Sequence, residues 1–134
     1  MDKNYTQRPI PMSMWGKDHW TTLLYIASRC TDYHGVPALE HMRTDPDRHP
    51  GLASPRVPYG DKRYPTMLAA GAQAHDHDDW DCADDIETAG FVRVLGTGVN
   101  PVFKMTEKGW EVVKQLQTHR AQGLPSATFS PKAA

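Results

Sequence analysis

Residues 78–120 read DDWDCADDIETAGFVRVLGTGVNPVFKMTEKGWEVVKQLQTHR. Within this stretch Gly90 can supply the positive φ angle of a helix C-cap, and residues 91–95 are mostly β-branched and aromatic. A glycine-rich segment at 96–100 separates them from a second apolar run at 101–105. This order predicts a helix that ends before Gly90, then a two-stranded hairpin, then a further helix.

Residue spacing indicates which sides of these two helices are buried. We expect the first helix to begin at Asp78 or Asp79 and to run to about Ala89, and Thr106 to cap the second helix. Gly123 predicts where the second helix ends. The residues expected to be buried are Cys82, Ala83, Ile86 and Ala89 in the first helix and Val112, Val113 and Leu116 in the second.

The chain before this stretch is less regular. Residues 1–14 are interpreted as an irregular tail, and Asp18 is a suitable N-cap for a helix. Prolines and glycines punctuate residues 44–65, which predict a long loop, and short helical turns are expected at 37–42 and 66–70. The apolar face expected for the helix after Asp18 consists of Trp20, Leu23, Leu24, Ala27 and Cys30.

Length and composition limit the class of protein. A chain of 134 residues predicts one domain, here 15–123, between tails at 1–14 and 124–134. Fifteen Lys and Arg against sixteen Asp and Glu give a net charge of −1, which excludes a uniformly basic nucleic-acid coat. Two cysteines are too few for a secreted disulfide scaffold, and no segment approaches the roughly 18 apolar residues of a membrane span. We therefore expect a soluble, cytoplasmic, mostly helical α+β protein.

Two junctions in the helix–hairpin–helix stretch carry a family resemblance: Ala89-Gly90-Phe91 and Met105-Thr106-Glu107-Lys108-Gly109. With them, residues 78–120 resemble the C-terminal half of a winged-helix domain, as in regulators of the multiple-antibiotic-resistance type. The resemblance implies that the first helix is a recognition helix and that the hairpin is a wing. It implies a winged-helix-like fold interrupted by the long proline-rich loop.

Three further segments are Trp15-Gly16-Lys17-Asp18-His19-Trp20, His77-Asp78-Asp79-Trp80-Asp81-Cys82 and Gly96-Thr97-Gly98-Val99-Asn100-Pro101. Through them the chain is similar to small uncharacterised proteins that phages and mobile elements encode. This resemblance implies an origin and no mechanism.

Negative charge is concentrated on the predicted recognition helix. Seven of the sixteen acidic residues stand within 76–87, and no Lys or Arg occurs between Tyr64 and Val92. A helical projection places Asp81, Asp84 and Asp85 opposite the predicted buried face, where DNA phosphates would repel them. We interpret this helix as a protein-binding surface, with a merely solvated helix face as the alternative. Its predicted contact residues are Asp78, Asp79, Trp80, Asp81, Asp84 and Asp85.

Positive charge lies elsewhere. Basic residues interleaved with aromatic ones can hold phosphates or an acidic protein surface. Such polarity also permits a head-to-tail or two-fold contact between copies, hence a homodimer. The predicted basic contact residues are Arg43, Arg48, Arg56, Lys62 and Arg63 in or beside the loop, and Arg93 and Lys104 in the hairpin.

Candidate chemistry is sparse. His75, His77 and Cys82 are zinc-type donors, with His19 among the candidates for a fourth, but their spacing matches no established motif. We interpret them as a core cysteine with exposed histidines and predict no cofactor, with zinc as the alternative. Asp18 and His19 would not form a dyad, because adjacent helical residues point about 100° apart. No nucleophile or phosphate-binding motif is present, so we predict no catalysis.

Four tryptophans are many for this length. Trp20 and Trp110 occupy helix positions that suit a core. Trp15 and Trp80 stand at element starts; we interpret them as core residues, with half-exposed side chains that could anchor a partner as the alternative.

These patterns predict a non-enzymatic binding or regulatory protein, of phage-type origin. It would inhibit or modulate a protein or a protein–nucleic-acid complex through the acidic helix and the basic loop. One alternative is a winged-helix transcription regulator that binds duplex DNA. A second is a zinc-stabilised sensor or small enzyme.

Overall fold

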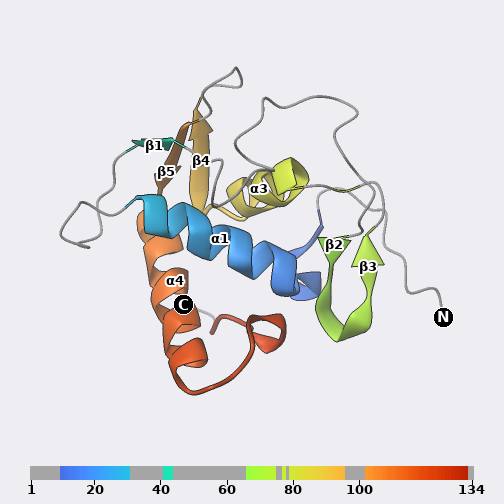
Figure 1. Cartoon of the computed structure of the whole chain (residues 1–134). Coiled ribbons are helices and arrows are strands. Elements are labelled where there is room, and N and C mark those ends of the chain that lie inside the picture. Colours follow the sequence, from blue (N-terminus) through green and yellow to red (C-terminus); the bar gives the residue numbers. More distant parts are fainter. Residues whose placement is uncertain are drawn as a thin grey trace.

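The structure is a computed structural model of the chain and describes residues 10–30, 41–43, 66–74, 77, 79–95 and 102–132. These residues form an α+β fold in which helices pack beside two small antiparallel sheets (Figure 1). The α-helices are α1 (Lys17–Arg29), α3 (Asp79–Thr88) and α4 (Glu107–Ala121). The strands are β1 (His41–Arg43), β2 (Thr66–Met67), β3 (Gln73–Ala74), β4 (Val92–Leu95) and β5 (Val102–Met105). Three single-turn 3-10 helices are η1 (Met12–Met14), η2 (Ala69–Gly71) and η3 (Ser126–Thr128).

The helix–hairpin–helix order predicted for the second half of the chain is confirmed. Gly90 follows α3 with a φ angle of 89°, and Gly123 follows α4 with a φ angle of 82°, conformations that glycine adopts without strain. The Thr106 hydroxyl accepts a hydrogen bond from the Gly109 amide at 2.9 Å, which is the expected N-cap. The turn expected at 96–100 lies outside the described residues.

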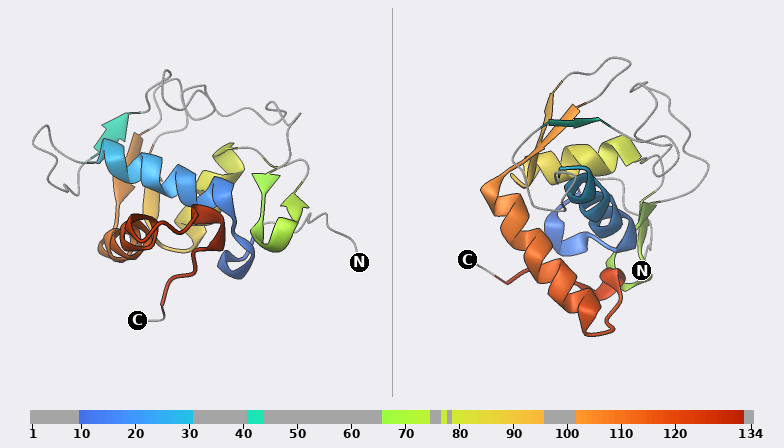
Figure 2. Two further views of the ribbon diagram at one scale, coloured as in Figure 1. Left: turned by 60° about the horizontal axis from the view of Figure 1, so that its bottom comes forward. Right: turned by 60° about the vertical axis from the view of Figure 1, so that its left-hand side comes forward.

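The three-stranded sheet has the order β1-β5-β4. Phe103 in the central strand β5 is fully buried, whereas the next residue, Lys104, stands in register with His41 on one side and Arg93 on the other. Because successive side chains of a strand point to opposite faces, one face of the sheet belongs to the core and the other carries Lys104 and Arg93. In Figure 2, α1 and α3 lie on the same side of this sheet.

Helix α1 crosses the middle of the molecule and contacts α3, α4 and η3 (Figures 1 and 2). Trp20 packs edge-on against Phe129 with ring centroids 4.8 Å apart, and Trp15 packs edge-on against Phe91 at 5.9 Å. Burying one large apolar side chain contributes about 1.5–3 kcal/mol. The buried residues of α1 are His19, Trp20, Thr22, Leu23, Ile26 and Ala27.

The start of α1 differs from the prediction. The helix begins at Lys17 with Gly16 at the N-cap, not with Asp18. The Asp18 carboxylate instead accepts a hydrogen bond from the Met67 amide of β2 at 2.6 Å. The β2–β3 hairpin approaches the start of α1 this closely because Gly16 has no side chain. A Cβ at Gly16 would lie 2.5 Å from the Leu68 carbonyl carbon.

Two short helical turns were expected where the structure has strands. The helix predicted at 37–42 is wrong at its end, because His41–Arg43 pair with β5 as β1. Within 66–70, Thr66–Met67 form β2 and pair with β3, and only the turn at Ala69–Gly71 is helical. In both places pairing with a distant strand overrides the local pattern.

The two segments predicted as tails contribute to the core. Ile10 is 2% exposed, and Phe129 is 7% exposed. Residues 126–128 form η3, with Ser126 buried. The expectation of a loose chain after residue 124 is therefore wrong for residues 126–129, because Trp20 offers Phe129 an aromatic partner.

Trp15 and Trp80 are also buried, at 2% and 5% exposed, which confirms core packing and rules out the alternative of half-exposed anchors. Trp80 stacks on Phe103 with ring centroids 5.7 Å apart. The Trp15 indole nitrogen donates to the Ile10 carbonyl at 3.0 Å. Both rings thus find partners inside the fold rather than on another molecule.

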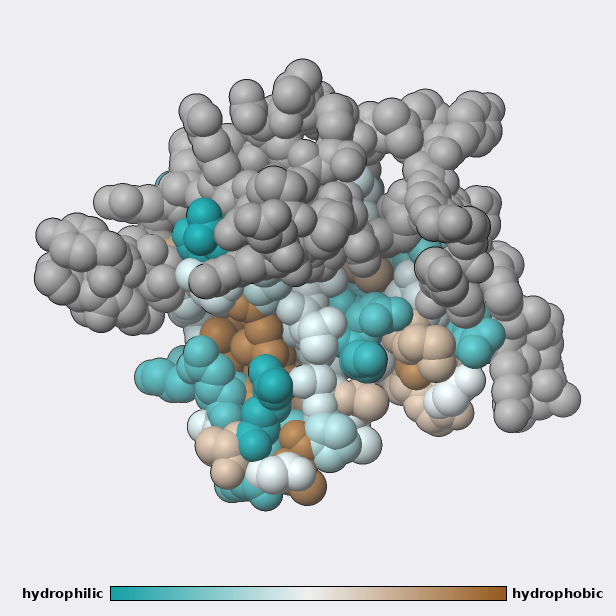
Figure 3. Space-filling view, in the orientation of Figure 1, coloured by the Kyte–Doolittle hydropathy of each residue, from teal (hydrophilic) through white to brown (hydrophobic). Residues whose placement is uncertain are grey.

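Hydrophilic side chains line the lower left of the molecule in Figure 3, where α4 lies, with apolar side chains between α4 and α1.

Across the described part of the chain, no helix combines the length and apolar character needed to cross a membrane. The proline-rich segment 44–65 lies outside that part.

Candidate functional site

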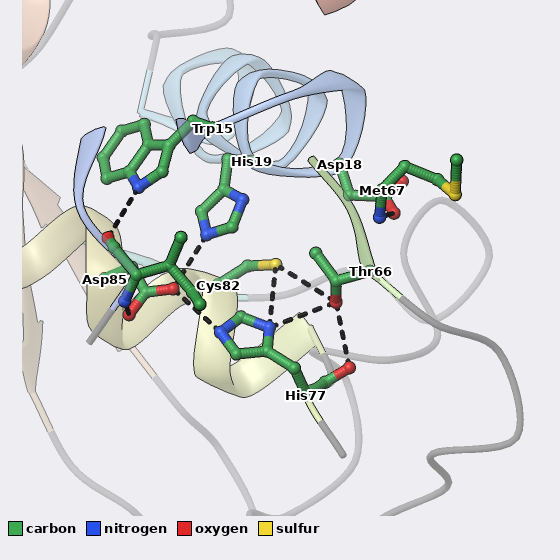
Figure 4. A network of polar contacts seen from close by, with 9 residues as sticks. Trp15, Asp18, His19, Thr66, Met67, His77, Cys82 and Asp85 are labelled. Carbon is green, nitrogen blue, oxygen red and sulfur yellow. Dashed lines mark hydrogen bonds and ion pairs between the residues drawn. The ribbon is translucent and has the colours of Figure 1, made fainter. Parts of the chain in front are cut away.

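A buried polar cluster joins α1 to α3. Nε2 of His19 lies 2.8 Å from Oδ2 of Asp85, and Nε2 of His77 lies 2.9 Å from the same oxygen. Figure 4 shows the two imidazole rings converging on this one carboxylate. His19, His77 and Asp85 are 0%, 2% and 4% exposed, so the cluster is closed to solvent.

The second oxygen of Asp85 is also occupied. Oδ1 accepts a hydrogen bond from the Ile10 amide at 3.1 Å, which ties the N-terminal segment to α3. Burial alone would raise the pKa of Asp85, but the hydrogen bonds from His19 and His77 outweigh it and lower the pKa. Asp85 is therefore an ionised carboxylate inside the protein.

His77 is held from its other side by the start of β2. Its Nδ1 lies 3.1 Å from the Thr66 hydroxyl oxygen, and that hydroxyl donates to the His77 carbonyl at 2.9 Å. The Cys82 thiol is 3.9 Å from the same Nδ1 and 4.0 Å from the hydroxyl (Figure 4). Thr66 therefore fixes the direction in which the His77 ring presents Nε2.

His19 is held mainly by packing. Its ring stacks on Trp15 at a centroid distance of 5.0 Å, and its buried Nδ1 has no hydrogen-bond partner among the described residues. Burial lowers the pKa of His19, and the hydrogen bond to Asp85 opposes this shift only in part. As predicted, the neighbouring Asp18 forms no dyad with it: Asp18 binds the Met67 amide instead.

The acidic helix is only partly the surface that its sequence predicted. The placement of Asp85 on the exposed face is wrong, because its carboxylate points into the cluster. The Glu87 carboxylate accepts from the Val94 amide at 2.7 Å and so secures the junction of α3 and β4. Asp81 and Asp84 are half-buried. Trp80 is buried, as stated above, and Asp78 and the side chain of Asp79 lie outside the described part.

Asp85 could have been found from its position in the helix. It stands three residues after Cys82 and four before Ala89, two members of the predicted apolar stripe. Cys82, Ala83 and Ile86 of that stripe are fully buried as expected. A carboxylate on such a stripe signals a buried partner, because unpaired buried charge is strongly unfavourable.

The group of possible metal ligands in the structure differs from the zinc donors that the sequence suggested. His77 is buried, so its interpretation as an exposed histidine is wrong, and Cys82 is buried as expected. Three nitrogen and oxygen atoms, one each from His19, His77 and Asp85, all lie within 4.8 Å of one another and could hold a metal ion. Cys82 is not a member of this group, and His75 lies outside the described residues.

The two basic residues predicted in the β4–β5 hairpin stand opposite each other on neighbouring strands. Arg93 of β4 is exposed, and its register partner Lys104 of β5 is half-buried. Arg43 belongs to β1 at the edge of the same sheet. The predicted loop residues Arg48, Arg56, Lys62 and Arg63 lie outside the described part of the chain.

Comparisons with known proteins give no relatives: the chain matches no protein-family model, no curated protein and no solved structure.

Proposed function

We propose that this is a non-enzymatic binding protein with a winged-helix-like domain, and that it contacts a protein or a protein–nucleic-acid complex. The order α3–β4–β5–α4, with Thr106 capping α4, supports the winged-helix-like assignment. A binding role is favoured over catalysis because the histidine and carboxylate groups of the buried cluster are closed to solvent, so no substrate reaches them.

One observation carries the proposed contact surface: Arg93 and Lys104 are direct cross-strand neighbours on the sheet face that points away from the core. The Cβ atoms of cross-strand neighbours lie about 5 Å apart, so both cations belong to one patch of the sheet face, where their like charges repel unless a partner of opposite charge is bound. Opposite charge across an interface steers association and fixes its orientation. The partner is accordingly a macromolecule with an acidic patch.

The structure changes the acidic contact surface that the sequence predicted for α3. Asp85 is internal and the Glu87 carboxylate binds the Val94 amide, so neither of these two acids is offered to a partner. Seven acidic residues stand within 76–87, and no Lys or Arg between Tyr64 and Val92 offsets this negative charge against DNA phosphates. The partner is therefore more readily a protein surface of mixed charge than a bare duplex.

The test is affinity capture from the native cytoplasm, with and without nuclease, followed by mass spectrometry. We expect a partner that the wild-type chain retains and that the double variant Arg93→Glu/Lys104→Glu loses. Lys114→Glu is the matched control, because Lys114 is an exposed cation on α4, away from the sheet. A partner retained equally by all three proteins would contradict the sheet-face proposal.

Duplex DNA is the alternative that the helix–hairpin–helix order favours. It predicts binding that weakens steeply with salt, since each phosphate contact releases counterions. It also predicts that Asp81→Ala/Asp84→Ala leaves or improves binding. Nanomolar duplex binding with these properties, lost in Arg93→Glu/Lys104→Glu, would replace the protein-partner proposal.

A further inference from the structure

We propose that His19, His77 and Asp85 bind a divalent metal ion of the zinc class through Nε2, Nε2 and Oδ2, and that this ion fastens α1, the segment before α3, and α3 together. The site is independent of the sheet face proposed above, and neither proposal depends on the other.

Two of the three distances between the ligand atoms are close to those of a zinc centre, and all three atoms lie within 4.8 Å of one another. Each Nε2 lies 2.8–2.9 Å from Oδ2. Zinc bonds of about 2.0–2.1 Å in tetrahedral geometry place neighbouring ligand atoms about 3.3 Å apart. The atoms therefore need to separate by roughly half an ångström to admit the ion, a movement that side-chain rotation supplies.

The contacts of Thr66 orient the His77 ring so that Nε2 faces Asp85. The Thr66 hydroxyl donates its single proton to the His77 carbonyl, so toward Nδ1 the same oxygen can only accept. When Nδ1 carries the hydrogen and donates it to Thr66, Nε2 presents a lone pair that can bind a metal ion. Nε2 lies 2.9 Å from Oδ2 of Asp85, and in the metal-free protein it donates a hydrogen bond to this oxygen; the ion would replace the proton of that bond.

Metal-bound histidines characteristically donate their second ring N–H to a neighbouring acceptor, which orients the ring. Thr66 can occupy this position for His77, whereas the buried Nδ1 of His19 has no acceptor among the described residues. The Ile10 amide donates to the second oxygen of Asp85 and so holds that carboxylate in place.

The charge of the cluster also favours a cation. Asp85 is a buried carboxylate whose described partners are two histidines and one amide, without any Lys or Arg. An isolated buried charge is strongly unfavourable unless it is paired or coordinates a metal. Two imidazoles with one carboxylate select zinc-class ions over Mg²⁺ or Ca²⁺, which prefer all-oxygen sites.

The closure of the site makes the ion structural. The three ligands are almost fully buried, so a bound ion would have no route to substrate. His19 and Asp85 stand 66 residues apart in the chain, so a metal bond between them ties distant segments of the fold. Binding would therefore be coupled to folding.

The first test uses the full chain without a histidine tag, stripped of metal with a chelator and titrated with Co²⁺ and then Zn²⁺. We expect a visible Co²⁺ absorption band that saturates at one ion per chain and that Zn²⁺ abolishes. We also expect a rise in Tm with Zn²⁺ that the chelator reverses. An absent band with an unchanged Tm would overturn the proposal and place a proton between His77 and Asp85 instead.

The second test removes single ligands. His19→Gln and His77→Gln are expected to weaken Co²⁺ binding by at least about 100-fold, beyond the 10- to 100-fold typical of supporting residues. His119→Gln is the control, since this histidine of α4 bonds to the Pro125 carbonyl far from the cluster. Equal Co²⁺ affinity in all variants would overturn the assignment.

A third measurement keeps the proposal falsifiable even where these variants do not fold. Zinc-edge X-ray absorption of the loaded wild-type chain should show nitrogen and oxygen neighbours with the multiple scattering of two imidazoles. Sulfur at about 2.3 Å would instead place the ion on cysteine and overturn the site.

Discussion

Helices α3 and α4 are both rich in charged residues, yet they place those charges differently. In α4, Val112, Val113 and Leu116 are buried, as helical spacing predicts, while Glu111 and Lys114 remain exposed. In α3 the apolar stripe is equally regular, but Asp85 within it is buried too. Helical periodicity locates the buried side of a helix. It does not decide whether a charged residue on that side has found a partner elsewhere in the chain.

The largest expected effect tests this contrast directly. Asp85→Ala leaves the Ile10 amide and two imidazoles without their acceptor, and breaking a buried charge network costs about 3–5 kcal/mol. Glu111→Ala on the exposed side of α4 should change stability by less than about 0.5 kcal/mol. Urea unfolding with a chelator present measures both. Similar losses for the two variants would mean that the charges of α3 and α4 do not differ in role.

A second prediction concerns a feature of α4 that a helical projection conceals. A Cβ at Gly109 would contact the Phe91 carbonyl oxygen and lie 2.8 Å from its carbonyl carbon. Gly109→Ala should therefore destabilise by about 1–3 kcal/mol, the range for overpacking, although the same change in an open helix gains up to about 1 kcal/mol. Gln117→Ala, at an exposed position of α4, is the control for helix propensity. A stabilised Gly109→Ala protein would refute the close contact.

A smaller effect is expected at the start of α4. Thr106 accepts from the Gly109 amide and donates to the Gly90 carbonyl at 2.6 Å, so it joins the end of α3 to α4. Thr106→Ala should cost about 1 kcal/mol, and Thr106→Ser should recover most of it. Thermal unfolding compares these variants with Thr118→Ala, an exposed threonine of α4. No difference between Ala and Ser at 106 would exclude the cap.

The smallest effect leaves stability unchanged and concerns reactivity. Burial raises the pKa of Cys30 to about 11, from an ordinary value of 9.0. The thiolate is the reactive form, so alkylation of Cys30 at pH 8 should be about 100-fold slower in the folded chain than in the unfolded one. Peptide mapping after iodoacetamide treatment follows Cys30 separately from Cys82. Equal rates in the two states would show that Cys30 is accessible.

Local chemistry accounts for what the sequence could predict. Gly90, Thr106 and Gly123 act through their own backbone or a neighbour three residues away, so the hairpin and both flanking helices follow from a short window. The partner of Asp85 on α1 is 66 residues away, and no local rule could pair the two. His19 was a candidate donor on residue type alone. Only the fold places it beside His77.

The same reasoning explains the errors in the first half of the chain. Asp18 has the chemistry of an N-cap, but β2 provides a better donor in the Met67 amide. Residues 41–43 have no strand pattern of their own and become β1 through pairing with β5. Non-local pairing of this kind requires the rest of the fold to be present.

The burial of Ile10 and Phe129 has a practical consequence for anyone shortening this protein. A fragment cut to residues 15–123 would strip away the acceptor of the Trp15 indole proton, the amide donor to Asp85, and the ring that covers Trp20. Such a fragment would keep α1, α3, α4 and the strands β1 to β5 and still lose both ends of its core.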